Sequence, residues 1–483
     1  MEAKIKMKKN GYSKEFISMF REYDIRGLVN PEQLNERSVY RIVKAYGAFI
    51  KSRGICKAVV GYDNRDCSVG FAQSAIKALT DMGINVYFIG LTLSPVAYYA
   101  QYLYKCEGLV MITASHNPNG WSGFKLGVGY SSTLSKDEII EVFNNVDKRF
   151  PKPRKKGVVV SCDVRDQYIE EVVKRINMGS YRPRVLIETA NGGAGLFAYE
   201  IFQRLGCITF LLNADPDTSY PRYFPNPSDL KARKKMEELV THNYIKADIG
   251  LFFDGDGDRL GVVDEKGKSV WSDKVIALLS ESILKKKKGA KVVYDVKCSR
   301  SLTEVVKALG GVPIMWSTGH SYIKSKMKEE NAELAGERSG HIFIGGDEYF
   351  GFDDGIFAGA KLVEYLSNAK KPMTRLIERL PRYITSPEIY VECDDAVKYE
   401  IVDKLVAKFK EMYGARVIDI NGARVEFENG WGLVRASSNM PMLGLLFEGK
   451  TEQDVREIKK IFKSVMSGFK ELHKDWINDN DEY

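Results

Sequence analysis

Short apolar runs rich in β-branched residues alternate along this chain with longer amphipathic segments. The runs predict strands, at residues 58–60, 86–90, 109–113, 185–188, 249–253 and 292–295. The segment 71–82 has the spacing of a helix with one apolar face. Because strands that alternate with helices form parallel or mixed sheets covered by helices, the pattern predicts an α/β protein.

Polar or proline-rich stretches interrupt this alternation. They lie at residues 151–157, 264–268, 370–372 and 381–387. At 483 residues the chain is also too long for one core. We therefore expect four domains of similar size, at residues 1–165, 166–268, 269–380 and 381–483.

Three of the predicted domains share a local pattern, a strand followed by a turn rich in Gly, Asn or Ser. The pattern occurs at residues 60–65, 187–193 and 294–300. A repeated supersecondary unit leaves this kind of trace. It suggests that the first three domains are related.

The composition excludes several classes of protein. The net charge of +8 is modest, and the basic runs 154–156 and 285–288 lack interleaved aromatic residues, so we expect solvated faces and no nucleic-acid partner. Seven scattered cysteines without Cys-x-x-Cys spacing indicate reduced thiols in a cytoplasmic protein. No apolar stretch approaches the length of roughly 20 residues that spans a bilayer, so we expect no membrane partner.

The most informative stretch is residues 254–259, which read Asp-Gly-Asp-Gly-Asp-Arg between two apolar runs. Carboxylates at alternate positions can turn their oxygens toward one point, where a hard divalent cation removes their repulsion. A calcium loop would need glycine where Arg259 stands, and helices on both sides. Alone, the stretch could also be a solvated acidic turn. We predict a magnesium-type site on a strand–loop–strand turn, beside an arginine suited to phosphate.

A second candidate is the motif Thr-Ala-Ser-His-Asn-Pro at residues 113–118. Ser115 ends a predicted strand, and Pro118 keeps the loop from becoming helix, so the hydroxyl should stand at a strand's carboxyl end. A serine hydrolase is the alternative, since His116 follows. Neighbouring side chains usually project in different directions, however, and no Gly-x-Ser-x-Gly elbow occurs. Beside the acidic site, Ser115 is a candidate phosphoryl carrier whose phosphate would also bind the cation.

Two further loops have polar side chains suited to a sugar phosphate. In Gly-Glu-Arg-Ser-Gly-His at 336–341, Glu337 and Ser339 suit vicinal hydroxyls because glycines let the backbone approach closely. The motif Arg-Ala-Ser-Ser-Asn-Met-Pro at 435–441 offers an arginine fork, hydroxyls and an amide, which form a plausible anion nest. Its candidate ligands are Arg435, Ser437, Ser438 and Asn439. Either motif alone would be an ordinary loop.

With Phe-Arg-Glu-Tyr-Asp-Ile-Arg-Gly at residues 20–27, these motifs occur in the order and at the spacings of one family. From about residue 20 to near its C-terminus the chain resembles the alpha-D-phosphohexomutases, of the phosphomannomutase/phosphoglucomutase branch. The resemblance implies four domains around a central cleft. The first three would be related α/β mixed-sheet units and the fourth a smaller α+β domain, each contributing one of the loops.

The resemblance also implies a mechanism. Ser115 would carry phosphate and, with Asp254, Asp256 and Asp258, hold Mg²⁺. The phosphoryl group would pass to a hexose phosphate, giving a hexose 1,6-bisphosphate that turns around and returns its other phosphate, so that the bisphosphate is both intermediate and activator. Arg259 would stabilise the transferring group. Family positions for proton transfer or orientation are matched by Lys125, His320 and His341, and positions for substrate binding by Tyr23, Arg26, Lys297 and Arg300.

The expected substrates are small hexose phosphates, mannose and glucose phosphates among them. The phosphate that is not reacting would be held by Arg435 and its neighbours, with Lys297 or Arg300 opposite. Because Glu337 and Ser339 would grip the 3- and 4-hydroxyls in either orientation, we expect weak discrimination at C2.

Two alternatives stay open at this point. One is a phosphoglucosamine mutase, which usually has glutamine where this chain has Arg338. The other is a non-catalytic sugar-phosphate binding protein, against which the intact reacting residues argue. We expect a monomer or a homodimer.

Overall fold

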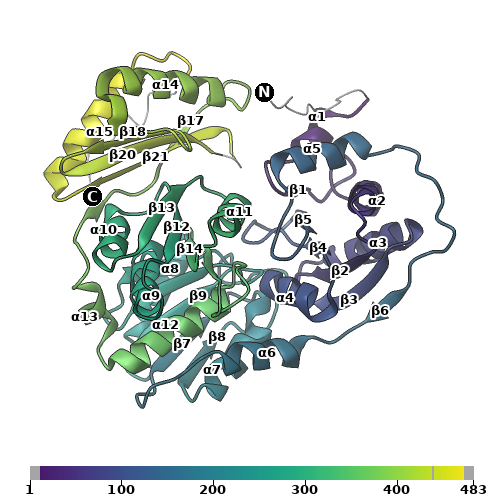
Figure 1. Ribbon diagram of the computed structural model, residues 1–483, viewed down its shortest axis with the longest axis horizontal. Coiled ribbons are helices and arrows are strands. Elements are labelled where there is room, and N and C mark those ends of the chain that lie inside the picture. Colours follow the sequence, from purple (N-terminus) through teal and green to yellow (C-terminus); the bar gives the residue numbers. More distant parts are fainter. Residues whose placement is uncertain (1–10, 438–439, 473–483) are drawn as a thin grey trace.

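Four β-sheets, each with its own helices, follow one another in the computed structural model of this protein, which describes residues 11–437 and 440–472 (Figure 1). We call the parts of the chain around these sheets domains 1 to 4. In Figure 1, domain 1 lies at the right and domain 4 at the upper left, with domain 3 below domain 4.

Domain 1 contains a six-stranded sheet of order β1-β5-β4-β2-β3-β6. Its strands are β1 (Ile25–Leu28), β2 (Lys57–Tyr62), β3 (Asn85–Leu91), β4 (Gly108–Ile112), β5 (Trp121–Val128) and β6 (Val159–Ser161). Its helices are α1 (Lys14–Ser18), α2 (Glu36–Ser52), α3 (Ser68–Asp81), α4 (Ser94–Tyr104) and α5 (Lys136–Asn145). Residues of α2 and α3 pack in one core and residues of α4 in another, so helices cover both faces of the sheet.

Domain 2 contains a five-stranded sheet of order β11-β10-β9-β7-β8. Its strands are β7 (Arg184–Glu188), β8 (Ile208–Leu212), β9 (Ile249–Phe253), β10 (Leu260–Asp264) and β11 (Ser269–Val270). Its helices are α6 (Arg165–Lys174), the 3₁₀ helix η1 (Gly193–Leu196), α7 (Ala198–Arg204) and α8 (Leu230–Val240).

Domain 3 contains a four-stranded sheet of order β13-β12-β14-β15. Its strands are β12 (Lys291–Asp295), β13 (Val312–Trp316), β14 (Leu334–Gly336) and β15 (Ile342–Ile344). Its helices are α9 (Ser272–Lys286), α10 (Arg300–Ala308), α11 (His320–Glu330), α12 (Gly355–Ala369) and α13 (Met373–Ile377).

Domain 4 has a different architecture, in which every strand pair is antiparallel. Its strands are β16 (Ile384–Thr385), β17 (Ile389–Glu392), β18 (Val417–Ile418), β19 (Ala423–Phe427), β20 (Gly430–Ala436) and β21 (Met442–Gly449). Its helices are α14 (Lys398–Tyr413), η2 (Gly414–Arg416) and α15 (Glu452–Met466). The core of the domain lies between α14, α15 and the sheet.

The first three domains repeat one topology, as the sequence suggested. In each, a central strand, β2, β7 or β12, pairs in parallel with a neighbour on both sides. In each, one of those neighbours continues into an antiparallel hairpin, β4–β5, β9–β10 or β14–β15. The mixed α/β units and the smaller α+β domain predicted from the sequence are confirmed.

The strands predicted from apolar runs are confirmed, and the predicted helix at 71–82 is α3. One predicted break is instead a hairpin turn. The Oδ1 atom of Asp264 accepts hydrogen bonds from the amides of Lys266 at 3.0 Å and Lys268 at 2.9 Å, and β11 then pairs with β10. The sheet of domain 2 thus extends to Val270, past the expected boundary at 268. An aspartate that bonds nearby backbone amides makes a turn of this kind within a domain as readily as between two.

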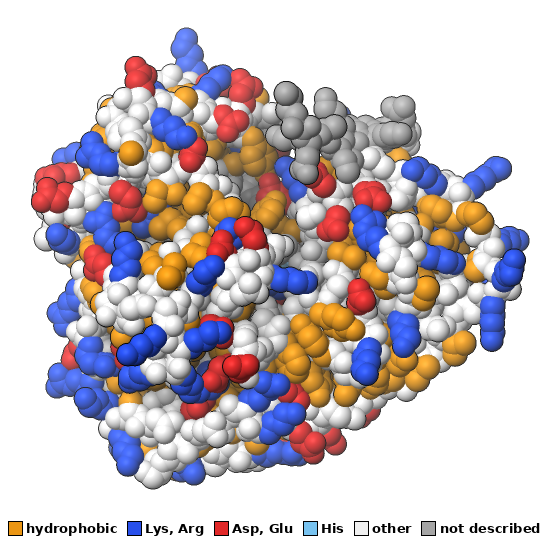
Figure 2. Space-filling model, in the orientation of Figure 1, with side chains coloured by type: hydrophobic (Ala, Val, Ile, Leu, Met, Phe, Trp, Pro, Cys, Tyr) orange, Lys and Arg blue, Asp and Glu red, His pale blue; other side chains and the backbone are white. Residues whose placement is uncertain are grey.

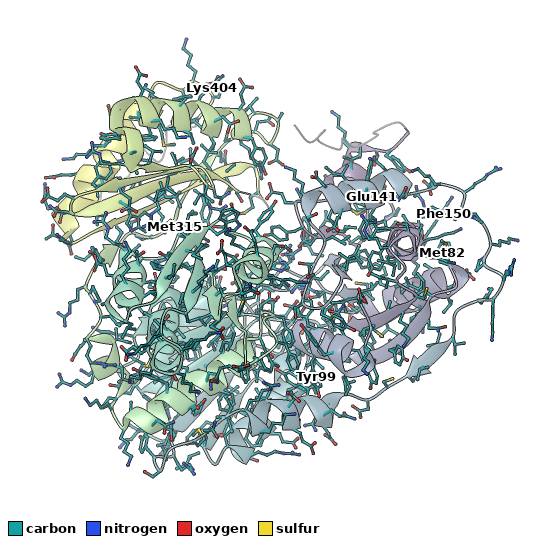
Figure 3. The ribbon with its side chains drawn as sticks, viewed as in Figure 1. Met82, Tyr99, Glu141, Phe150, Met315 and Lys404 are labelled. Carbon is teal, nitrogen blue, oxygen red and sulfur yellow. The ribbon has the colours of Figure 1, made fainter. Side chains whose placement is uncertain are left out.

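One hydrophobic core runs through domains 1 to 3, whereas domain 4 has its own. A small cluster of Val296, Trp431, Leu433 and Leu446, with Met315 packed against it, joins domain 4 to domain 3. Figure 3 shows Met315 at this junction and Tyr99 where domain 1 meets domain 2. Polar contacts add to this junction, since Arg424 of domain 4 donates to the carbonyl oxygens of Val296 at 2.6 Å and Cys298 at 2.8 Å.

The surface carries both signs of charge. On the face shown in Figure 2, Lys and Arg side chains are interspersed with Asp and Glu, and the surface is hollowed between domain 4 and domain 1. All seven cysteines are free thiols. Within the described residues, no helix is long and apolar enough to cross a membrane.

Candidate active site

Three of the four predicted motifs lie in equivalent places, in the hairpin turns of the repeated unit. The serine loop (residues 113–120) joins β4 to β5, the acidic loop (254–259) joins β9 to β10, and the glutamate loop (337–341) joins β14 to β15. The amide of Leu260 donates to the carbonyl of Gly340 at 3.0 Å, so the last two loops are bonded through their backbones. The repeat therefore brings motifs far apart in sequence to one centre.

The serine loop meets the acidic loop through their side chains. The hydroxyl of Ser115 donates to Oδ2 of Asp254 at 2.8 Å, and both residues are buried. The two loops also touch closely at Gly255, where a Cβ atom would lie 2.6 Å from the carbonyl oxygen of Ser115. Position 255 therefore requires glycine, because there is no space for a side chain between the two loops.

His116 does not lie where we expected it. Its Nδ1 atom is 3.1 Å from the hydroxyl oxygen of Ser115, so these neighbours do project toward each other. The reason is the left-handed backbone of Ser115, whose φ is +51°. The burial of His116, followed by the charge of Arg259, holds the pKa of its imidazole well below the usual value. His116 is therefore a neutral neighbour of the carrier hydroxyl.

The three aspartates of the acidic loop form a group suited to a hard cation. Their nearest oxygens all lie within 4.8 Å of one another, and all three side chains are fully buried. Over the described part of the chain, Oδ1 of Asp256 and Oδ1 of Asp258 have no hydrogen-bond partner. Burial, and then the charges of Asp258 and Asp256, raise the pKa of Asp254 well above its usual value. Carboxylate oxygens with unused lone pairs and mutual repulsion fit a divalent cation of the magnesium type.

The ammonium group of Lys125 lies against the same carboxylates. It binds Oδ2 of Asp258, and Oδ2 of Asp256 at 2.7 Å. Burial acts to lower the pKa of Lys125, but Asp256 and Asp258 outweigh it and hold that pKa well above the usual value. The hydroxyl of Ser94, at the start of α4, donates to Asp256 at 2.6 Å and accepts from Lys125 at 3.0 Å. No sequence signal pointed to Ser94.

His341 holds Arg259 in place. Nε of Arg259 donates to Nε2 of His341 at 2.9 Å, and Nδ1 of the same ring lies 3.0 Å from Oδ2 of Asp353. A guanidinium can only donate, so Nε2 accepts and the ring proton belongs on Nδ1, toward Asp353. Within the described residues the ring is thus hydrogen-bonded through Nε2 alone, while Nδ1 lies at ion-pair distance from Asp353.

His320 is placed differently from His341. The two imidazole rings stack with centroids 5.4 Å apart, and Tyr23 meets His320 edge-on at 4.9 Å. Burial, followed by the charge of Lys324, holds the pKa of His320 well below its usual value. Lys324 in turn donates to Oδ1 of Asp353 at 3.1 Å. His320 is therefore a neutral base at neutral pH.

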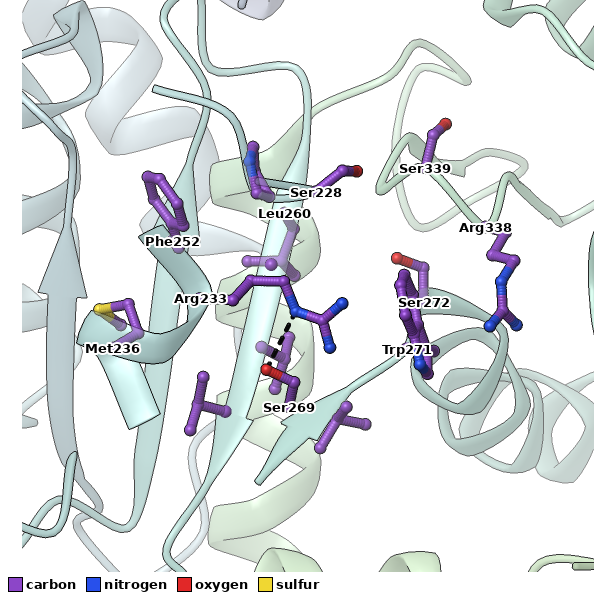
Figure 4. A pocket seen from close by; sticks show the side chains of 15 residues that line it. Ser228, Arg233, Met236, Phe252, Leu260, Ser269, Trp271, Ser272, Arg338 and Ser339 are labelled. Carbon is purple, nitrogen blue, oxygen red and sulfur yellow. Dashed lines mark hydrogen bonds between the residues drawn. The ribbon is translucent and has the colours of Figure 1, made fainter. Parts of the chain in front are cut away.

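The glutamate loop presents one face to the centre and is supported from behind. Ser339 donates to Oε2 of Glu337 at 2.8 Å. The side chain of Arg338 turns toward Trp271 and α9, away from Ser339 (Figure 4). Its guanidinium lies 4.3 Å from the ring centroid of Trp271 and 2.8 Å from Oδ2 of Asp273. Arg338 thus anchors the glutamate loop to Trp271 and Asp273, on the side of the loop away from Ser339.

The fourth predicted motif, the arginine loop, follows β20 in domain 4. Among the residues that the structure describes, the buried Nε atom of Arg435 has no hydrogen-bond partner. Burial acts to raise the pKa of Glu388, but the charges of Lys297 and then Arg435 outweigh it and hold that pKa below its usual value. The positive charges of Lys297 from domain 3 and Arg435 from domain 4 therefore both act on one carboxylate, which makes them candidates for a shared anion site.

The neighbours of Arg435 are partly described. Met440 donates its amide to Oγ of Ser437 at 3.2 Å, and the buried ammonium of Lys398 donates to the carbonyl oxygen of Ser437 at 2.6 Å. Ser438 and Asn439, which the sequence also indicated, lie outside the described residues.

Two predicted substrate-binding arginines have protein partners. Arg300 donates to the carbonyl oxygens of Phe427 at 2.7 Å and Gly430 at 2.8 Å, which ties α10 to domain 4. The structure does not group it with Arg435. Arg26 donates to Asn117 of the serine loop at 2.8 Å and to Asp24 at 2.7 Å.

A hydroxyl held against buried carboxylates at the meeting point of three related domains has the geometry of a phosphoryl-transfer enzyme. Family models agree over almost the whole described chain. Those of phosphoglucomutase/phosphomannomutase alpha/beta/alpha domains I, II and III match residues 18–153, 166–267 and 271–383, and that of the C-terminal domain matches 388–464. The chain belongs to the phosphoglucomutase/phosphomannomutase family and is an enzyme of the mutase class.

Individual relatives are similar over nearly their full length. A phosphomannomutase/phosphoglucomutase of Pseudomonas putida is 37% identical over 450 residues, covering 93% of this chain and 95% of the relative. A phosphoglucomutase of Neisseria meningitidis is 37% identical over 452 residues, covering 93% and 96%. The crystal structure of a phosphoglucomutase/phosphomannomutase family protein from Burkholderia thailandensis matches with a TM-score of 0.86 at 33% identity, covering 93% and 97% of the two chains.

Proposed function

We propose that this protein interconverts the 1-phosphates and 6-phosphates of mannose and glucose through a phosphoserine at Ser115. The observation that carries the proposal is the 2.8 Å contact between the Ser115 hydroxyl and Asp254, which joins the carrier to the acidic loop. The names of relatives at 36–37% identity support the choice of mannose and glucose.

The transfer is balanced in atoms and protons. The bond from phosphorus to Oγ of Ser115 breaks as a bond to a free sugar hydroxyl forms. The sugar hydroxyl loses a proton, for which the neutral imidazole of His320 is the first acceptor. That proton ends on the oxygen of Ser115 as its hydroxyl re-forms, so the step neither gains nor loses a proton. When the hexose 1,6-bisphosphate has turned around, the same steps in reverse return its other phosphate to Ser115.

The acidic loop fits Mg²⁺ by its unsatisfied carboxylate oxygens. The holding residues would be Asp254, Asp256, Asp258 and the phosphorylated Ser115. Bound there, Mg²⁺ would neutralise charge on the transferring group. Arg259, held by His341, is positioned to bind an oxygen of the same group, while the burial of Ser115 excludes the water that would hydrolyse the phosphoserine.

The remaining polar groups would hold the sugar in either orientation. Lys297 and Arg435 suit the phosphate that is not reacting, since the charges of both act on one carboxylate, that of Glu388. Glu337 and Ser339 suit two neighbouring hydroxyls. We therefore assign the 3- and 4-hydroxyls to this pair, which leaves C2 weakly discriminated and both sugars as substrates.

Coupled assays with mannose 1-phosphate, glucose 1-phosphate and glucosamine 1-phosphate, run in parallel with Mg²⁺, test the proposal. We expect kcat/KM for the first two within about tenfold of each other, and for glucosamine 1-phosphate at least about 100-fold lower. Turnover of only one of the first two would overturn the dual specificity. A preference for glucosamine 1-phosphate would indicate a phosphoglucosamine mutase, and binding without any turnover a non-catalytic protein.

A further inference from the structure

Ser115 holds a backbone conformation that serine rarely adopts. Its φ of +51° lies in the left-handed region, where the Cβ atom of an L-residue crowds the backbone. Such a conformation persists only when the surrounding structure enforces it. The groups that bond the serine loop therefore decide where the carrier hydroxyl points.

The strongest of these groups is the guanidinium of Arg65, which is bonded to four backbone carbonyls of the serine loop and its end. Nη2 donates to the carbonyl oxygens of Ser115 at 3.0 Å and Asn117 at 2.6 Å. Nη1 donates to those of Pro118 at 3.0 Å and Trp121 at 3.1 Å. Arg65 is 5% exposed, so these hydrogen bonds are shielded from water. The serine loop is therefore bonded at four carbonyl groups to one planar guanidinium.

The carboxylate of Asp63 orients the guanidinium of Arg65. Its Oδ2 atom accepts from Nε of Arg65 at 3.1 Å and lies 3.4 Å from the amide of Ala114, the residue before the carrier. Its Oδ1 atom accepts from the hydroxyl of Ser68 at 2.7 Å. Asp63 is 2% exposed. The buried pair thus connects the end of β2 to both sides of Ser115.

The same turn also contacts the domain that carries the acidic loop. Nδ2 of Asn64 donates to the carbonyl oxygen of Asn191 in domain 2 at 3.0 Å. The ring of Tyr220, also in domain 2, lies 5.8 Å from the guanidinium carbon of Arg65. Residues 63–65 therefore bond the serine loop and also contact domain 2, the domain that contains the acidic loop.

We infer that Arg65 is a positioning residue, which fixes the backbone of Ser115 so that its hydroxyl meets Asp254. The inference rests on the proposed function. The guanidinium bonds carbonyl oxygens of the loop and a carboxylate, not the hydroxyl of Ser115, so it acts through the loop. Its removal should slow phosphoryl transfer to and from Ser115 while leaving the affinity for hexose phosphate nearly unchanged, because the residues proposed to hold the sugar lie in domains 3 and 4.

The test compares Arg65→Lys with wild type. Lysine keeps the charge but cannot bond four carbonyls from one plane, so the loop loses its geometry. A misplacement of about 1 Å costs on the order of 100-fold in rate. We expect kcat to fall by about 100-fold, with KM for glucose 1-phosphate within about threefold of wild type. The rate of phosphoserine formation from glucose 1,6-bisphosphate, followed by intact-protein mass spectrometry, should fall by the same factor as kcat.

A second variant and a control exclude a general loss of structure. In Arg65→Ala, added guanidinium ion should restore at least about tenfold of the lost turnover by filling the vacated site. The control is Arg53→Lys in the same domain, where Arg53 donates to the carbonyl oxygen of Phe49 at 3.2 Å and pairs with Glu141 at 2.9 Å, away from Ser115. It should keep wild-type kinetics. If Arg65→Ala fails to fold, Arg65→Lys decides the question.

The outcomes separate the two claims. An active wild type with Arg65→Lys turnover and phosphoserine formation within about threefold overturns the role of Arg65 alone. A raised KM with unchanged kcat also overturns it, because that is the signature of a substrate-binding residue. A wild type without mutase activity overturns the proposed function and this inference with it.

Discussion

The hydroxyl oxygen of Ser115 lies 2.8 Å from Oδ2 of Asp254, although 139 positions separate the two residues in the chain. The contact joins the proposed carrier hydroxyl to the loop that is proposed to hold a cation. Substitutions of Ser115 and of Asp254 can therefore measure separately what each residue contributes to turnover.

Replacing Ser115 with alanine should abolish mutase turnover, by at least about 1,000-fold, because the variant lacks the hydroxyl proposed to carry the phosphoryl group. Binding of glucose 1-phosphate, measured by isothermal titration calorimetry, should stay within about threefold of wild type, since the residues proposed to hold the sugar are untouched. Turnover at the wild-type rate in this variant would refute the phosphoserine mechanism.

Asp254→Asn should separate stability from activity. Because the folded protein holds the pKa of Asp254 above its unfolded value of about 3.9, this carboxyl favours folding at low pH and that contribution is lost as pH rises. Asparagine removes the repulsion from Asp256 and Asp258. Without Mg²⁺ at pH 7.5, the variant should therefore melt about 2–4 °C above wild type.

The same variant should be at least about 100-fold less active with Mg²⁺, having lost one of the three acidic ligands. Thermal scans at pH 5 and pH 7.5 provide the check. The advantage in Tm should shrink at pH 5, and an advantage independent of pH would contradict the electrostatic cause.

Gly255→Ala should misplace the serine loop without changing any polar group. The new methyl group would lie 2.6 Å from the carbonyl oxygen of Ser115 and 3.2 Å from Pro225, so a loop must move. A loss of about 100-fold in kcat follows from a displacement of about 1 Å. The matched control is Gly468→Ala, where the nearest atoms are 3.6 and 3.7 Å away and no effect on turnover is expected. Equal kinetics in both variants would show that the close approach has no role.

Tyr399→Phe should weaken the contact of domain 4 with domain 1. The phenol of Tyr399 donates to Oε1 of Glu22 at 3.1 Å, across the boundary between these domains. Loss of a partly exposed hydrogen bond is worth about 0.5–1 kcal/mol, so KM for glucose 1-phosphate should rise about two- to fivefold with little change in kcat. In the control Tyr383→Phe, the lost bond is from Tyr383 to Glu304 at 2.6 Å, between domains 4 and 3, and KM should stay at its wild-type value. A rise of KM in both variants would argue against a specific role for the Glu22 contact.

The strands and the repeated unit were predictable because their signal is local. Buried strands of parallel sheets read as short apolar runs, and β7, β9 and β12 lie where such runs occur. The turn at 264–268 could not give the exact end of the domain 2 sheet, because Asp264 makes the same backbone contacts in a hairpin as at a domain boundary.

Other site residues had no local signal. Arg65 is an arginine in an ordinary turn until the fold sets four carbonyls around it, and Ser94 begins a helix like many other serines. His341 was a candidate from the family resemblance, and His116 was considered only as the neighbour of Ser115 in a serine hydrolase. Their real partners, Ser115 and Arg259, depend on a left-handed φ and on a hairpin from another domain.

The sequence by itself determined which groups are candidates for the chemistry, because the proposed carrier hydroxyl, the three carboxylates and the proposed sugar-binding loop lie in contiguous motifs. The tertiary structure alone decided which groups act and which position the others. Proton transfer, charge balance and the orientation of the Ser115 hydroxyl depend on distances between side chains from different domains. Such distances arise only when three copies of one folding unit place their hairpin turns at a common centre.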